Sequence, residues 1–256
     1  MYLRGVHADA TIPVLRQLIR ENPLGILTTA IRSSIAPFIQ SSHIPFIIDV
    51  QDEGSETELG VLRAHLARQN PQSKAMIEAV QAQPPSSSNV LEEEVLVLFT
   101  STAQHYVTPK FYSETKPSTG KVVPTWNYAA AQVYGKAKIY WDPKSKEAIT
   151  FLSKQINDLS KHAETSIMGY TGADGRPGAW SVTDAPERFI ELLRTNIIGI
   201  EIKIDRLEGK FKMSQELSRN DREGVIEGFR ALETEVGHKV SDIVKERGEL
   251  KQAQLS

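Results

Sequence analysis

The sequence predicts an α+β fold in which antiparallel strands form a small β-barrel and helices lie around it. Three observations lead to this class. Short runs rich in β-branched residues come early in the chain, a helix interrupts them, and further strands followed by helices complete the order. Strands and helices do not alternate regularly, as they would in a parallel sheet. Seven or so strands around one core are typical of a small barrel.

Composition limits the class of protein. The 256 residues are 40% hydrophobic and 24% charged, which is near the globular average and excludes a disordered chain. A net charge of -2 gives no field for polyanions, so we expect no strong nonspecific nucleic-acid binding. Because cysteine is absent, disulfides, thiol nucleophiles and iron–sulfur clusters are excluded.

The chain carries no sign of membrane insertion or export. No run approaches the ~18 apolar residues of a membrane span, and the start, MYLRGVHADA, lacks the apolar core of a signal peptide. We therefore expect no membrane partner and a cytoplasmic location, with the nucleus as the alternative.

The first half of the chain is predicted to hold two helices and four strands. Thr11 and Pro13 open the first helix, and Asn22-Pro23 ends it, because proline disfavours helix at the preceding residue. Asn70-Pro71 opens the second helix, over 70–80. The predicted strands are 25–30, 43–50, 59–67 and 94–100, and 84–88 is an exposed loop. The apolar run 94–100 is expected at the centre of the core.

The second half is predicted to begin with strands and to end with helices. Strands are expected at 122–128, 131–140 and 197–204, and Glu208-Gly209 is read as a turn into a last strand, 210–214. Pro143 opens one helix, 187–194 forms another, and Asp221 caps a third. The stretch 166–186 is rich in Gly, Asp and Pro and is expected to be loop, while the tail from Val240 is amphipathic.

Several common chemistries have no motif in this chain. It lacks a glycine-rich phosphate loop, a Gly-x-Ser-x-Gly elbow and a His-Glu-x-x-His sequence. The six histidines are spread out, and no two of them have the i,i+4 spacing common among metal ligands. We therefore predict no metal site, and the sequence identifies no catalytic acid or base.

The segment from His65 to Pro71 is the densest group of unusual residues. Arg68 offers a bidentate fork for phosphate, and the following helix offers the free N–H groups of its first turn. The alternative is that Arg68 is an exposed charge at a strand end and that Asn70 is only a helix cap. Spacing alone favours this alternative.

Two further segments are candidates for a ligand-binding wall. Pro124 to Tyr128 concentrates two aromatic and two hydrogen-bonding side chains, as a planar heteroaromatic ligand requires, although the same residues could fill a barrel corner. In 210–215, Lys210, Lys212 and Ser214 share a face that suits an anionic ligand, or a solvated strand face. Phe211 and Met213 are expected to face the core.

Seven segments together carry a family resemblance. They match in kind and order over nearly the whole chain: Asn22-Pro23, 42–45, 65–71, 106–109, 123–128, 198–201 and 209–215. Here the chain resembles the PaiB-type FMN-binding negative transcriptional regulators, which belong to the pyridoxamine-phosphate-oxidase-like split barrels. The loop near Pro84 and the Gly-rich stretch are similar to the fungal branch of that family.

The resemblance implies a six-stranded split barrel that forms a homodimer and holds FMN between the subunits. Ser42, His43 and the run from His65 to Arg68 would then line the flavin and its phosphate. Thr125, Trp126 and Asn127 would form an adjacent wall, and Lys212 and Gln215 would approach from the C-terminal part. We expect the split-barrel domain over 1–215 and a helical extension over 216–256.

Three positions depart from the family pattern. Ser73 stands where the family commonly has Trp, Gln132 where it has His, and Glu216 where it has Asn. If the replaced residues contact the ligand, the affinity for flavin or its reactivity differs from that of the family.

Three functions are compatible with these observations. The first is a dimeric FMN-binding protein that acts as an oxidoreductase on a small molecule. The second is a transcriptional regulator that senses a small-molecule ligand without turnover, and the third is a haem-binding or haem-degrading split barrel. Residues 201–256 carry 11 Lys and Arg against 12 Asp and Glu, so we expect no direct DNA binding.

Overall fold

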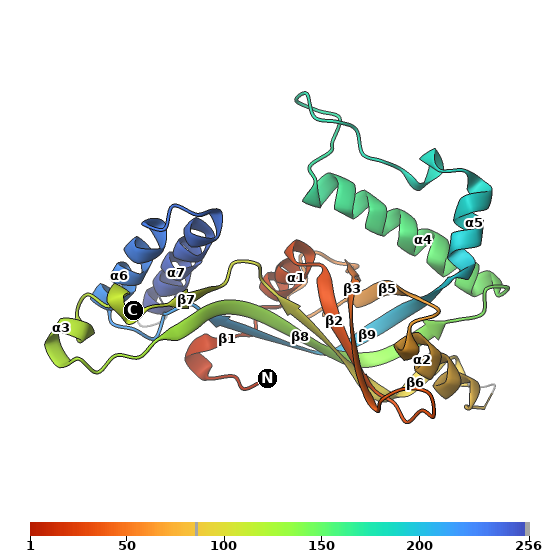
Figure 1. Ribbon diagram of the computed structural model, residues 1–256, viewed down its shortest axis with the longest axis horizontal. Coiled ribbons are helices and arrows are strands. Elements are labelled where there is room, and N and C mark those ends of the chain that lie inside the picture. Colours follow the sequence, from red (N-terminus) through yellow and green to blue (C-terminus); the bar gives the residue numbers. More distant parts are fainter. Residues whose placement is uncertain (85–86, 254–256) are drawn as a thin grey trace. The chain divides into compact units, whose positions relative to one another are not determined.

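The computed structural model describes residues 1–84 and 87–253, which form a mixed arrangement of strands and helices (Figure 1). The strands are β1 (Ala8–Asp9), β2 (Leu24–Ala30), β3 (Ile39–Pro45), β4 (Ile47–Asp49), β5 (Val61–Ala67), β6 (Val90–Thr100), β7 (His105–Val107), β8 (Thr125–Tyr140) and β9 (Ile197–Lys212). The helices are α1 (Ile12–Glu21), α2 (Pro71–Gln81), α3 (Thr115–Thr119), α4 (Lys146–His162), α5 (Glu187–Thr195), α6 (Arg219–Arg230) and α7 (Glu235–Ala253).

The strands form one sheet in the order β3-β2-β6-β8-β9-β5-β4, with β1 paired to β9 and β7 paired to β8. The pairings β2–β3, β2–β6, β4–β5 and β5–β9 are antiparallel. The predicted α+β class, an antiparallel split β-barrel with peripheral helices, is confirmed. The apolar run 94–100 lies within β6, in the interior of the sheet, as expected.

The chain divides into two compact units. Unit 1 comprises 1–11, 100–132 and 208–256, and unit 2 comprises 12–99 and 133–207. The long strands β8 and β9 contribute residues to both. Residues 254–256 and two residues of the predicted 84–88 loop, Pro85 and Ser86, lie outside the described part of the chain.

Unit 2 is built around alternating apolar residues of its strands. Leu27 of β2, Val97 and Phe99 of β6 and Ile200 of β9 are fully buried. Helix α4 packs beside β5 and α5 (Figure 1), and its Phe151 ring stacks on Tyr140 of β8 with the ring centroids 4.0 Å apart. This core fixes the strands that carry the predicted site residues.

Unit 1 contains the antiparallel helix pair α6–α7, which lies side by side in Figure 1. Phe229 of α6 and Val240 and Val244 of α7 are fully buried. The Phe111 ring meets the Phe229 ring edge to face, with the centroids 5.3 Å apart. Phe211 and Met213 are buried, as predicted.

Two predicted chain breaks are wrong. Strand β8 runs without interruption through 129–131, where buried alanines keep the backbone in the sheet. Strand β9 also continues through Glu208-Gly209, because Gly209 pairs with Asp9 and Lys210 pairs with Ala8 of β1. The predicted turn is therefore a paired stretch of strand.

Three other boundaries differ from the prediction. The predicted strand 43–50 is interrupted at Phe46, whose N–H donates to the carbonyl of Pro23. Helix α4 begins at Lys146 and not at Pro143. Helix α6 is capped by Ser218, while the Asp221 carboxylate is buried and accepts hydrogen bonds from Thr115 and from the Glu114 N–H.

Candidate functional site

The nine predicted site residues fall into two groups, one in each unit. Unit 2 holds Ser42, His43, His65 and Arg68, and unit 1 holds Thr125, Trp126, Asn127, Lys212 and Gln215.

The start of helix α2 organises the group in unit 2. The Asn70 side chain caps the helix by accepting from the Gln72 N–H at 2.8 Å, and proline occupies the first helical position. The same Asn70 amide donates to the Ser42 hydroxyl of β3 at 3.1 Å. Ser42 therefore lies directly beside the N-terminus of α2, where the helix dipole favours anions.

Several buried polar atoms near this point have no hydrogen-bond partner within the described residues. They are Gln40 Nε2, Gln72 Oε1 and Ser73 Oγ. The Gln72 Nε2 group, by contrast, donates to the carbonyls of Leu27 and Gln40 and to the Thr29 hydroxyl, so this side chain is firmly held. We call Gln40, Ser42, Asn70, Gln72 and Ser73 the α2 polar cluster.

Sequence reasoning did not assign Gln40, Gln72 or Ser73 to the site. Ser73 was singled out only as a departure from the family pattern, and it is fully buried. A buried serine hydroxyl and a buried glutamine carbonyl without partners are the signal that would have pointed to them, but burial at single positions is not visible in the sequence.

His65 lies on β5, opposite Gly199 of β9. Its Nδ1 atom is buried and has no partner within the described residues. Burial lowers the pKa of His65, so the ring is neutral at pH 7 and carries one donor and one acceptor. His43, in contrast, is exposed on β3.

Arg68 is held by backbone carbonyls. Its Nε donates to the Thr195 carbonyl at 3.1 Å, and its Nη2 donates to the carbonyls of Trp141 and Ile197. Burial lowers the pKa of Arg68, and the neighbouring Asp142 opposes this shift. The alternative of a merely exposed charge is wrong, because Arg68 is half-buried and joins the ends of β5, β8 and β9.

The group in unit 1 is brought together by hydrogen bonds. The Lys212 ammonium donates to the Thr125 hydroxyl and, at 3.1 Å, to the Trp126 carbonyl. The Trp126 ring is 49% exposed and donates from Nε1 to Gln104. Lys212 and the Trp126 ring are thus the members of this group that can still face a ligand.

Asn127 and Gln215 have structural hydrogen bonds. Asn127 is fully buried and bonds to Ser214, while Gln215 accepts from the Met213 N–H at 2.7 Å and donates to the Val6 carbonyl at 3.0 Å. Ser214 follows the end of β9 and is buried, so it does not share an exposed face with Lys212 as predicted.

Burial lowers the pKa of Lys212. The neighbouring Lys210 lowers it further by charge repulsion, and Glu216 acts in the opposite direction. Glu216, one of the departures from the family pattern, accepts a hydrogen bond from His7 Nε2 at 3.0 Å. An ammonium with a lowered pKa next to an exposed indole is suited to an anionic or electron-rich ligand.

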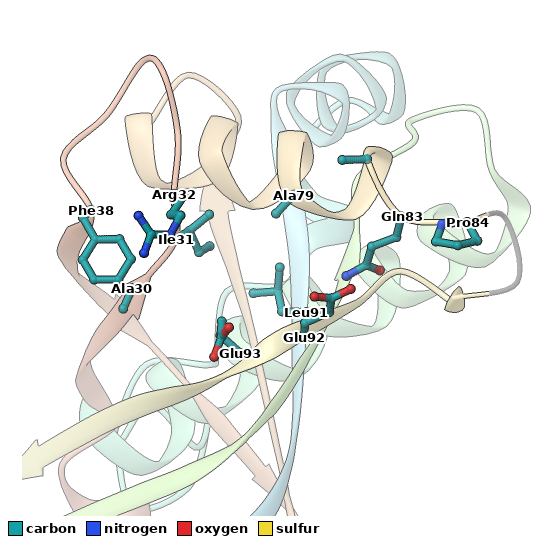
Figure 2. Close-up of a pocket in the computed structure, with 11 residues that line it drawn as sticks. Ala30, Ile31, Arg32, Phe38, Ala79, Gln83, Pro84, Leu91, Glu92 and Glu93 are labelled. Carbon is teal, nitrogen blue, oxygen red and sulfur yellow. The ribbon is translucent and has the colours of Figure 1, made fainter.

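A separate pocket in unit 2 holds none of the predicted residues. It has a volume of about 490 Å³ and lies between the β2–β3 connection, the end of α2 and the start of β6 (Figure 2). Arg32 lies 5.7 Å from the centroid of the Phe38 ring, and Glu92 and Glu93 line the opposite wall. This pocket therefore gives no support to the predicted flavin contacts.

Residues 1–84 and 87–253 contain no group of three or more His, Asp and Glu side chains placed to hold a metal ion. Among the described helices, none combines the length and the apolar character that crossing a membrane requires.

Comparison with known proteins defines the class as a flavin-binding protein. The chain matches the family model described as "Putative FMN-binding domain" over residues 1–206. It therefore belongs to this FMN-binding family, as the PaiB-type resemblance predicted.

Relatives in fungi and bacteria match nearly the whole chain. An uncharacterized protein of Aspergillus fumigatus is 60% identical over 98% of this chain and 99% of its own length. The protease synthase and sporulation protein PAI 2 of Bacillus subtilis is 24% identical over 96% of this chain and 98% of its own. Among solved structures, the FAD and haem binding protein from Mycobacterium smegmatis is 12% identical, with a TM-score of 0.44 over 80% of this chain and 73% of that one.

Proposed function

We propose that this protein is a homodimeric FMN-dependent oxidoreductase that acts on a small molecule. The observation that carries the proposal is the α2 polar cluster. Its buried atoms without partners are one donor, one acceptor and one hydroxyl, and they lie beside a helix N-terminus. Leaving such groups unsatisfied costs about 1–3 kcal/mol each, which a bound polar ligand would recover.

The residues present fit a flavin mononucleotide. The N-terminus of α2, Ser42 and the remaining donor capacity of Arg68 suit a phosphate group. The neutral His65 ring, with Nδ1 free, can donate to or accept from a heteroaromatic ring system. Bound FMN would supply the hydride chemistry, and these side chains would bind and orient it.

The group of residues in unit 1, taken alone, suits a small planar anionic ligand. Lys212 is held by Thr125 and Trp126 and has a lowered pKa, so its ammonium can release a proton more readily than a solvated lysine. The exposed Trp126 ring offers an apolar surface for a planar molecule.

The open ends of the sheet support the proposed homodimer. In the described chain, β3 ends the sheet on one side and β4 ends it on the other. An exposed edge strand pairs readily with another chain unless it is covered. A second copy related by a two-fold axis would cover these edges. Light scattering should give about twice the 28.5 kDa of one chain, and a value near one chain mass would reject the dimer.

The absorption spectrum of the purified full chain tests the cofactor. The two bands of oxidised flavin are expected, and mass spectrometry of the released molecule should identify FMN. A haem Soret band would favour the haem-binding alternative. Bleaching of the flavin bands by a nicotinamide reductant, with recovery in air or with an added acceptor, is the expected sign of turnover. Flavin that binds but is never reduced would favour a ligand-sensing regulator.

Matched histidine variants locate the flavin. His65→Leu should weaken FMN binding about tenfold or more, since a hydrogen bond to a buried ligand is lost. The control, His238→Gln, changes an exposed histidine on α7 and should leave affinity unchanged. Equal dissociation constants for the two variants would remove His65 from the site.

A further inference from the structure

Arg222 of α6 is a buried charge without a partner. The residue is 7% exposed, and within the described residues its guanidinium makes no hydrogen bond and no ion pair. The other buried arginines differ: Arg16 donates to three backbone carbonyls, and Arg63 pairs with Asp49 and Asp158. None of the Arg222 nitrogens is among the fully buried polar atoms that lack a partner, so the guanidinium is accessible and free to contact a ligand.

Gly248 of α7 provides the space in which Arg222 lies. A β-carbon at position 248 would lie 2.7 Å from Arg222 Cδ and 2.9 Å from Cζ, so alanine would displace the side chain. Gly248 is in the interior of a helix, where glycine costs about 0.5–1 kcal/mol relative to alanine. The fold therefore places next to each other two features that are unfavourable for stability, an unpaired arginine and a glycine within a helix.

Arg222 lines a pocket of about 310 Å³ between α6 and α7. Its lining residues are mostly charged: Arg219, Arg222, Glu223, Ile226, Glu227, Arg230, Lys245, Glu249 and Gln252. Two of the cations are already engaged, since Arg219 pairs with Glu223 at 2.8 Å and Arg230 with Asp242 at 3.4 Å. The guanidinium of the buried Arg222 therefore remains available to bind a ligand.

We propose that this pocket binds the carboxylate of a small molecule, with Arg222 as its main contact. A planar guanidinium matches a carboxylate or a phosphate in a bidentate pair. Three carboxylates, those of Glu223, Glu227 and Glu249, line the same pocket. They repel a phosphate dianion more than a singly charged carboxylate, so the carboxylate is the favoured group. The site lies outside residues 1–206 and does not depend on the flavin assignment.

NMR titration of the ¹⁵N-labelled full chain tests the proposal. The probes are acetate, its neutral isostere acetamide, and inorganic phosphate, at matched ionic strength with sodium chloride. Acetate should shift the Arg222 Nε–Hε signal in a saturable way, acetamide should not, and phosphate should act more weakly. Equal effects of acetate and acetamide, or tighter binding of phosphate, would overturn the proposal.

Variants separate a ligand site from a structural role. Gly248→Ala should weaken acetate binding about tenfold or more by displacing the guanidinium, whereas Glu246→Ala, at an exposed position on the same helix, should not. Arg222→Met should abolish the acetate response and raise the melting temperature, because an unpaired buried charge is removed. If Arg222→Met lowers the melting temperature and leaves the acetate response of other side chains unchanged, Arg222 has a structural role. This result would overturn the proposal.

Discussion

The Asn127 amide and the Ser214 hydroxyl are hydrogen-bonded to each other twice, across 87 residues of sequence. Asn127 Nδ2 donates to Ser214 Oγ at 3.0 Å, and Ser214 Oγ donates to Asn127 Oδ1 at 3.1 Å. Both residues are buried, and Ser214 has a φ of 60°, in the left-handed region that side chains rarely adopt. The pair therefore holds the chain in a strained turn directly after β9.

Loss of this pair should destabilise the protein. Ser214→Ala leaves the Asn127 amide buried without a partner and should lower the free energy of unfolding by about 1–3 kcal/mol. Ser214→Gly loses the same hydroxyl but accepts the positive φ, so its effect should be smaller by about 0.5–1 kcal/mol. Urea denaturation measures both, with the exposed Ser34→Ala as control. Equal losses for the two variants would contradict the strain argument.

Acid sensitivity is expected from the ion pairs around Arg63. Burial raises the pKa of Asp158, but hydrogen bonds from Lys154 and Arg63 outweigh burial and lower it overall. A carboxylate with a lowered folded pKa stabilises the fold above its unfolded pKa, about 3.9, and this stabilisation is lost as the pH falls through the folded value.

Asp158→Asn should therefore make unfolding less dependent on pH in that acidic window, while lowering stability at pH 7. Urea denaturation from neutral pH to below pH 4 compares the variant with the wild type. A pH profile identical to that of the wild type would show that Asp158 does not contribute.

Lys212 should titrate below the exposed lysines. Lys210→Gln removes a repelling charge and should raise the pKa of Lys212, whereas Glu216→Gln removes an attracting one and should lower it. NMR titration of the lysine Cε signals measures both, with the exposed Lys110 as reference. Because the folded pKa lies below the unfolded value of about 10.4, stability should increase as the pH rises between the two. An unchanged pKa of Lys212 in both variants would mean that the two neighbours do not act on it.

Arg68→Ala should affect binding and folding together. FMN affinity should fall by on the order of 1.5–3 kcal/mol, the range for a charge-assisted hydrogen bond. Stability should fall as well, because the carbonyls of Trp141, Thr195 and Ile197 lose their donor. Fluorescence titration of FMN and urea denaturation separate the two effects, with the exposed Lys74→Ala as control. Unchanged affinity with lower stability would leave Arg68 a purely structural role.

The isolated protein should not bind DNA in a sequence-specific way. The net charge is -2, and residues 201–256 carry 11 Lys and Arg against 12 Asp and Glu, whereas DNA-binding domains carry an excess of basic residues that neutralise phosphates. Anisotropy titrations against genomic fragments across a range of salt concentrations check this. Submicromolar binding to one fragment that weakens with salt would instead favour a direct regulator.

Local signals in the sequence were sufficient for most elements. Helix α2 was predicted to within one residue because Asn70 and Pro71 mark its start, and α1 ends at Glu21, just before Asn22-Pro23. The breaks in β8 and β9 were wrong because a turn signal such as Gly209 competes with strand pairing, and the partner, Asp9, lies 200 residues away. Short-range patterns contain no information about such a partner.

The same limit applies to the site. The segments were identified, but the partners of their side chains were not. Asn127 is held by Ser214, and Arg68 by carbonyls at 141, 195 and 197. The sequence did not identify Arg222 as a candidate because the neighbouring residues predict an ordinary charged helix. Its burial depends on Gly248, which belongs to another helix.

The division of the chain into units has a consequence for its synthesis on the ribosome. Unit 2 ends at residue 207, whereas unit 1 needs residues 208–256 in addition to its first and middle segments. At roughly 5–20 residues per second, translation of this last stretch takes several seconds. Throughout that interval all residues of unit 2 have been synthesised. The C-terminal partners of Asn127, Thr125 and the first residues of the chain have not yet been synthesised. A product that ends before residue 208 would lack Lys212 and Ser214, so Thr125 and Asn127 would be left without these hydrogen-bond partners.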